Sequence, residues 1–180
     1  GVSQMVGQLS KEDLHNQIQA VEAMLTDAQN DMRVLLLHLR PTELENKTLQ
    51  EGLQMILKEL TDKSNIRVVY KDMVKKVPKR IENNLFRIAQ EFISNTLKHA
   101  KASQIEVYLY QNSQEIQLKM LDNGVGYDLN ASTDEMSYGL KNIQERVDEM
   151  AGTVQFLSAK GKGTSIDVRV PILRGEDNVE

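Results

Sequence analysis

The chain has 180 residues, of which 40% are hydrophobic and 27% charged, and its formal net charge is −4. This length and hydrophobic content are enough for one domain with a hydrophobic core. The slightly negative net charge excludes the basic surface that is typical of a nucleic-acid-binding protein. The chain contains no cysteine, which excludes disulfides and thiolate metal sites and points to a reducing compartment. We find no apolar run of the roughly 18 residues that a membrane span needs, and no secretory signal.

The first residue is glycine, so we expect an excised piece of a longer protein in which residues 1–41 form an incomplete helical region. Apolar residues recur there at alternating spacings of four and three. These residues are Leu14, Ile18, Val21, Leu25, Ala28, Met32, Leu35 and Leu39. Such a heptad is typical of a coiled-coil or bundle seam, and Pro41 ends it. We expect dimerisation through this seam; the alternative is a helix packed against its own domain.

Residues 42–173 are expected to form a second unit of mixed helices and strands. The patterns predict helices at about 48–62, 79–100 and 138–151, and strands at about 66–72, 104–110, 115–121, 153–159 and 164–172. Because most strands are antiparallel and do not alternate strictly with helices, we predict an α+β two-layer sandwich, preceded by a long dimerisation helix. The polar residues 174–180 are expected to form a disordered tail.

The stretch RIAQEFISNTLKHA, residues 87–100, has an unusual polar stripe. On a helix at 100° per residue, one face carries Arg87, Glu91, Ser94, Asn95 and Lys98. The stripe combines a carboxylate, an amide and an ammonium group. It is either a salt-bridged solvent face or part of a site.

Three glycine clusters follow this stretch: DNGVGY at 122–127, YGLKN at 138–142 and GKGTSIDV at 161–168. Taken singly, each is explained by the positive φ that tight turns need. In combination, they offer close backbone approach, free N–H groups and a glycine-led helix start. A phosphate-bearing ligand needs these features.

In this order, the stretches QEFISNTLKHAKA, DNGVGY, YGLKNIQERV and GKGTSIDVRVP resemble the N, G1, G2 and G3 boxes of sensor histidine kinases. Their ATP-binding domain has the Bergerat or GHKL ATPase fold shared with gyrase and Hsp90. LLLHLRP at 35–41, together with a short lid, is similar to the HisKA_3 (NarL-type) subgroup, and within it to cell-envelope-stress sensors of the LiaS/VraS kind. The resemblance extends from about residue 14 to 172.

This resemblance implies an ATP-dependent protein-histidine kinase of a two-component system, with ATP and Mg²⁺ as cofactors. It implies a response regulator as partner, a homodimeric parent protein and no nucleic-acid partner. The chain would be a cytoplasmic fragment of a bacterial membrane sensor, attached to the membrane only through absent upstream segments.

The resemblance also implies roles for individual residues. Glu91 would orient a magnesium-bound water or assist proton transfer at the attacking imidazole, and Asn95 would give its amide oxygen to Mg²⁺. Lys98 would offset phosphate charge, and His99, rotated away from the stripe, would make a less direct contact. Asp122 would accept a hydrogen bond from the adenine amine and so select against guanine. The other expected ATP contacts are Gly124, Gly126, Tyr127, Gly139, Leu140, Gly161, Lys162, Gly163 and Thr164. The lid after Tyr127 receives no assigned contact.

A histidine kinase also needs an acceptor imidazole, and this chain has three histidines. His38 lies in LLLHLRP and His99 in the N box. His15 is followed five residues later by Ala20, where the subgroup's acceptor motif His-Asp-x-x-x-Gln has glutamine. GVSQ at 1–4 is the tail of that motif, a vector-derived sequence, or a start that falls late in the first helix. We therefore expect ATP-Mg binding without autophosphorylation.

Two other functions share the same ATP boxes. One is a GHKL-type serine kinase of the anti-sigma-factor class, against which the heptad ending in LRP argues. The other is a non-catalytic, ATP-gated scaffold module, which a complete set of ATP-site residues disfavours without excluding.

Overall fold

The computed structural model describes residues 11–38, 47–128 and 134–172. The elements, in chain order, are α2 (Lys11–His38), α3 (Leu49–Lys63), β1 (Arg67–Met73), α4 (Lys79–Asn95), the π-helical turn η2 (Thr96–Ala100), β2 (Gln104–Gln111), β3 (Glu115–Asp122), α5 (Asp134–Glu149), β4 (Thr153–Ser158) and β5 (Thr164–Pro171). The LRP signature, GVSQ, most of the lid's first half and the expected tail lie outside the described residues.

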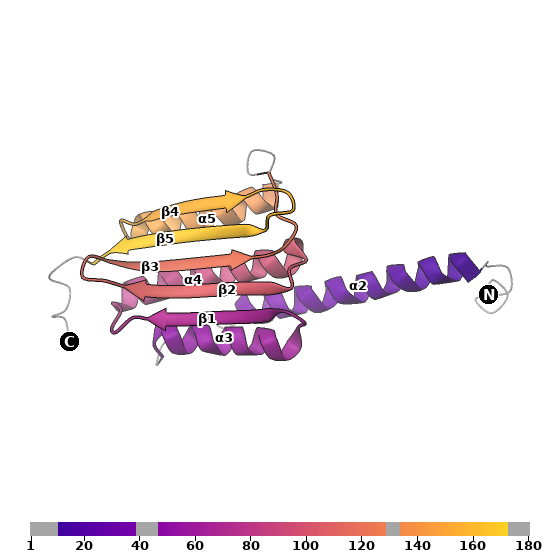
Figure 1. Ribbon diagram of the computed structural model, residues 1–180, viewed down its shortest axis with the longest axis horizontal. Helices are drawn as coiled ribbons and strands as arrows, with labels where there is room; N and C mark the ends of the chain where they lie inside the picture. Colours follow the sequence, from indigo (N-terminus) through magenta and orange to yellow (C-terminus); the bar gives the residue numbers. More distant parts are fainter. Residues whose placement is uncertain (1–10, 39–46, 129–133, 173–180) are drawn as a thin grey trace.

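The five strands form one sheet in the order β1-β2-β3-β5-β4. Strands β1 and β2 run parallel, and the other three neighbouring pairs run antiparallel. Figure 1 shows α3, α4 and α5 together behind the sheet, on one of its faces. The predicted two-layer α+β sandwich is therefore confirmed.

The core lies between the sheet and these three helices. Strands β2 and β3 bury every second side chain, as the period of a half-buried strand requires. The fully buried strand residues are Ile105, Val107, Leu109, Ile116, Leu118, Met120 and, on β5, Ile166, Val168 and Val170. They meet the apolar face of α4, including Leu85, Ile88 and Ile93. This packing fixes the ends of β3 and β5 relative to α4, where the candidate site lies.

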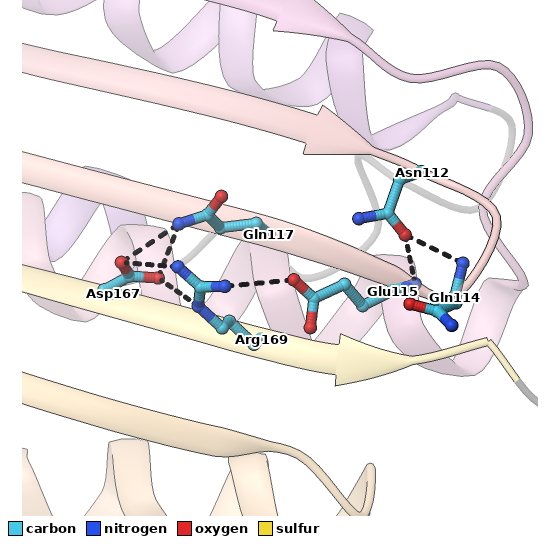
Figure 2. A network of polar contacts seen from close by, with 6 residues as sticks. All are labelled: Asn112, Gln114, Glu115, Gln117, Asp167 and Arg169. Atoms are coloured by element: carbon cyan, nitrogen blue, oxygen red, sulfur yellow. Dashed lines mark hydrogen bonds and ion pairs between the residues drawn. The ribbon is translucent and has the colours of Figure 1, made fainter.

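The opposite face of the sheet carries a polar network across β3 and β5 (Figure 2). Arg169 contacts Glu115 at 3.1 Å and Asp167 at 3.4 Å, and the Gln117 amide donates to Asp167 at 2.8 Å. Asn112 closes the β2–β3 turn, because its side-chain oxygen accepts the N–H groups of the two residues that enter β3. The network makes this face polar, in contrast to the helix-covered face.

Helix α2 projects away from the rest of the chain (Figure 1). Most of its heptad residues are open to solvent: Leu14, Ile18, Val21, Leu25, Met32 and Leu35 are 46–63% exposed. Helix α2 contacts α4 and η2, and Val34 is buried. The six exposed heptad residues therefore are not covered by the described part of the same chain.

Two helix boundaries differ from the expectation. Helix α4 ends at Asn95 and continues as a π-helical turn, where we expected one α-helix to residue 100. Helix α5 begins at Asp134 rather than near Tyr138, so the second half of the expected lid is helical. Among the described residues, no helix combines the length and the apolar character that a membrane crossing needs.

Candidate functional site

A cavity of about 230 Å³ opens between α4 with η2, the start of α5, and the ends of β3 and β5. Its lining residues are Phe92, Asn95, Thr96, His99, Ala100, Asp122, Val125, Gly126, Tyr127, Leu140, Ile143, Thr164 and Ile166. Apolar side chains from α4, α5 and β5 form most of the wall. The polar groups are few, as in a site that holds the flat, largely apolar part of a ligand and orients it.

Asp122, the last residue of β3, is 8% exposed within this cavity. One carboxylate oxygen, Oδ1, accepts the N–H of Gly124 at 2.8 Å. Burial raises the pKa of Asp122, while the Gly124 and Thr164 backbone and the neighbouring Thr96 and Thr164 side chains act in the opposite direction. The protein thus supports a buried acceptor at the end of an apolar cavity. Such a group recognises a ligand N–H.

The glycines of the 122–127 turn let this loop approach its neighbours. A Cβ at Gly124 would collide with the carbonyl of Ala100, to which Val125 N–H donates at 2.7 Å. Gly126 has a φ of +57°, and a Cβ there would collide with the carbonyl of Ala159. The glycines therefore bring the turn against η2 and against the 159–163 loop. Their observed role is to form the cavity wall.

Gly139 brings α5 against the polar stripe of α4. A Cβ at this position would lie 2.6 Å from Glu91 Oε1 and 3.2 Å from Asn95 Nδ2. The Asn95 amide nitrogen faces Glu91 Oε1 at 3.5 Å. The amide oxygen of Asn95 therefore points away from Glu91. Asn95 lines the cavity, and Glu91 precedes it by one helical turn.

The π-helical turn changes the expected placement of the residues after Asn95. A π turn is wider than an α turn, so it advances less than 100° per residue. His99, expected to be rotated away, therefore lines the cavity. Lys98, expected on the site stripe, instead lines a separate cleft of about 840 Å³ beside α2. Ser94, placed on the polar stripe from the sequence, is buried.

The third glycine cluster lies beside the cavity. Lys162 and Gly163 line a neighbouring cavity of about 300 Å³, which shares Asp122 and Thr164 with the first one. Gly161 has a φ of +74° and open space around it, and it lines neither cavity. The structure therefore brings Thr164 to the expected site, but not Gly161 or Lys162.

Sequence reasoning missed several lining residues. Three of them lie on helix faces whose sequence pattern predicts core positions: Phe92, Thr96 and Ile143. A fourth, Val125, lies between two glycines. Ile166 could have been found, because it follows Thr164 by two residues on a strand and so shares its face. Ser158, which lines the neighbouring cavity, is a further missed residue.

No group of three or more acidic or histidine side chains that could hold a metal occurs in the described part of the chain. The cavity instead offers one neutral amide oxygen, from Asn95. That donor suits a Mg²⁺ ion that takes most of its ligands from nucleotide phosphates and water. The residues therefore fit a magnesium–nucleotide complex. They do not fit a metal site whose ligands all come from the protein.

The fold and this cavity define a class of ATPase. Residues 80–174, more than half of the chain, match the family described as histidine kinase-, DNA gyrase B- and HSP90-like ATPase. The chain belongs to this family, and the fold expected from the four boxes is confirmed.

The chain is more specifically similar to bacterial sensor kinases. It is 41% identical over 170 residues to the sensor protein VraS of Staphylococcus saprophyticus, covering 94% of this chain and 49% of that protein. It is 43% identical over 159 residues to the sensor histidine kinase LiaS of Bacillus subtilis, covering 88% and 44%. The expected likeness to the LiaS/VraS kind is thus confirmed. The chain spans about half the length of these relatives.

A solved structure shares the fold at low sequence identity. The blue-light activated histidine kinase EL346 of Erythrobacter litoralis matches with a TM-score of 0.61 and 16% identity, covering 98% of this chain and 65% of that one. This likeness shows the fold alone.

Proposed function

We propose that this chain is the ATP-binding catalytic region of a two-component sensor histidine kinase. Its parent would transfer the γ-phosphoryl group of ATP to a histidine on the dimerisation helix, and onward to a response regulator in envelope-stress signalling. The observation that carries the proposal is a buried carboxylate, Asp122, and a carboxamide, Asn95, on the wall of one apolar cavity.

The Asp122 end of the cavity fits a purine base. Phe92, Ile143 and Ile166 supply apolar contact for a flat ring, and the Asp122 carboxylate accepts a hydrogen bond from an exocyclic amine. Guanine presents a carbonyl oxygen at that position, which a carboxylate repels. The site therefore favours adenine.

The Asn95 end fits the phosphates. Asn95 would give its oxygen to Mg²⁺, and His99 would face the phosphate oxygens from the next turn. Glu91, held beside Asn95, is placed to orient a metal-bound water or to accept the proton of an attacking imidazole. Bound ATP-Mg would supply the phosphoryl group and its charge neutralisation.

The partners follow from this assignment. A response regulator would receive the phosphoryl group, and two copies of the parent would pair through the α2 seam. ATP and a response regulator are cytoplasmic, so we place the domain on the cytoplasmic side of a membrane sensor.

Calorimetric titration of this chain with ATP, with and without Mg²⁺, tests the binding site. We expect Mg²⁺-dependent binding of ATP and much weaker binding of GTP. The absence of heat with adenine nucleotides and Mg²⁺ would overturn the proposal.

The chemistry is tested with labelled ATP-Mg and a chain extended upstream through the first dimerisation helix. We expect a phosphoryl label that is labile in acid and stable in base, as phosphohistidine is. An acid-stable label would indicate the serine kinase instead. ATP binding without any label would indicate the scaffold module.

A further inference from the structure

The end of β4 carries a serine that no sequence motif indicated. Ser158 is the last residue of β4, at the edge of the sheet, and it pairs with Thr164 on β5. Its side chain is half-buried. It lies where the turn after β3 meets the 159–163 loop and the start of β5, so one small side chain contacts three segments of the candidate site.

The Ser158 hydroxyl has three neighbours. Its oxygen accepts the N–H of Tyr127 at 3.0 Å, and it lies 3.1 Å from both the Gly163 carbonyl oxygen and Thr164 Oγ1. The Ser158 hydroxyl donates its single proton to the Gly163 carbonyl, so in the contact between the two hydroxyls Thr164 is the donor and the Ser158 oxygen accepts.

Thr164 lies beside Asp122 at the cavity. The two residues are register partners on β5 and β3, and both line the cavity, as Tyr127 does. The Ser158 oxygen thus accepts the Tyr127 N–H and the Thr164 hydroxyl proton, and it keeps both donors engaged next to the buried carboxylate.

We propose that Ser158 is a positioning residue for nucleobase recognition, which holds the Thr164 hydroxyl and the Tyr127 turn so that Asp122 stays an acceptor for a purine exocyclic amine. The inference rests on the proposed function and deepens it, since it assigns base selectivity to a residue that need not touch the base. Without the Ser158 hydroxyl, Tyr127 N–H loses its acceptor and the Thr164 hydroxyl can turn. A turned hydroxyl can donate to the carbonyl of an oxo-purine, which the native arrangement rejects.

The test compares ATP with ITP, because hypoxanthine differs from adenine by a carbonyl in place of the amine. We expect Ser158→Ala to lower the ratio of ATP to ITP affinity, measured by calorimetry with Mg²⁺, roughly three- to tenfold, the scale of one net hydrogen bond. Ser158→Thr keeps the hydroxyl and should keep the ratio. The matched control is Ser165→Ala, which removes the same atom from the opposite face of β5.

A purely structural role predicts a different result. If the role of Ser158 is only structural, Ser158→Ala should lower the thermal midpoint and reduce the affinities for ATP and ITP by the same factor. An unchanged ratio of ATP to ITP affinity in Ser158→Ala would therefore overturn the inference. If Ser158→Ala does not fold, Ser158→Cys, which has nearly the same shape and a weak donor, is judged by the same ratio. A wild-type chain that binds neither nucleotide would overturn the proposed function itself. A selective wild type with an equally selective variant would overturn only the role of Ser158.

Discussion

At the scale of residues, Asp122 is a compromise between stability and recognition. Its carboxylate is buried, which disfavours the charged form, yet the charged form is the one that would accept from an adenine amine in the proposed function. The Gly124 N–H donates to one of its oxygens at 2.8 Å, and Thr96 and Thr164 line the cavity beside it. In the proposed function, an uncharged acceptor would discriminate less well between purines than this carboxylate.

The raised pKa of Asp122 gives a testable dependence of stability on pH. Between the unfolded pKa near 3.8 and the raised folded value, the folded state binds more protons than the unfolded state, so stability falls as pH rises. We expect Asp122→Asn to lack this fall, and its thermal midpoint to rise relative to wild type as the pH increases through this interval. Thermal unfolding at a series of pH values measures the difference.

The control for this comparison is Asp148→Asn, on the exposed surface of α5. Its midpoint should follow that of wild type at each pH. A relative stability of Asp122→Asn that falls with increasing pH would contradict the expected sign. The same variant should bind ATP less selectively against GTP, because a carboxamide can donate to the guanine carbonyl.

Asn95 is expected to decide the magnesium dependence of binding. Removing the amide in Asn95→Ala should weaken ATP binding in Mg²⁺ at least about tenfold, the scale of an interaction with a charged group, and leave metal-free binding nearly unchanged. Calorimetry with and without Mg²⁺ separates the two effects. Asn83→Ala, an exposed asparagine on the same helix, serves as the control. Equal Mg²⁺ dependence in Asn95→Ala and wild type would show that the metal lies elsewhere.

At the scale of elements, the π-helical turn η2 connects the cavity with the long helix. Thr96 and His99 line the cavity, while Leu97 and Lys98 line the cleft beside α2. The single turn therefore forms part of both walls. A regular α-helix would have brought Lys98 toward the cavity and turned His99 away, as the sequence alone suggested.

The contact between α4 and α5 depends on a glycine. Gly139→Ala should gain about 0.5–1 kcal/mol of helix stability, but its methyl group would displace the end of Glu91 and press on Asn95. We expect a thermal midpoint within a few degrees of wild type and a several-fold loss of Mg²⁺-dependent ATP affinity. Gln144→Ala, on the exposed side of α5, should change neither. A variant with full affinity would show that Glu91 and Asn95 tolerate displacement.

At the scale of the whole molecule, α2 presents an apolar seam that none of the other described residues covers. At 1.5 Å per residue its 28 residues extend about 42 Å, far beyond the domain on which it ends. Exposed apolar residues along a heptad are typical of a helix that pairs with another helix. This arrangement supports the proposed dimer of the parent protein.

Charges in this seam should prevent self-association. We expect the double variant Ile18→Asp, Leu25→Asp to sediment as a monomer at concentrations where the wild-type chain associates, because each charge would face the partner's apolar residues. Analytical ultracentrifugation provides the measurement. Asn16→Asp, Gln19→Asp carries the same added charge outside the seam and should associate as wild type does. Association that survives in the seam variant would place the contact elsewhere.

The sequence by itself determined the elements and the ATP boxes of this protein. Heptad spacing, alternation in β2 and β3 and the apolar face of α4 are local patterns, so they indicated helices, strands and the two-layer sandwich without knowledge of tertiary contacts. Only the tertiary structure decided which box residues share a cavity. It placed His99 in the cavity wall and Lys98 in the cleft beside α2, and it placed Lys162 and Ser158 at the neighbouring cavity. These outcomes depend on a π turn and on loops that pack against one another at the ends of β3, β4 and β5. Such contacts join residues far apart in the chain. They therefore leave no periodic pattern in the sequence.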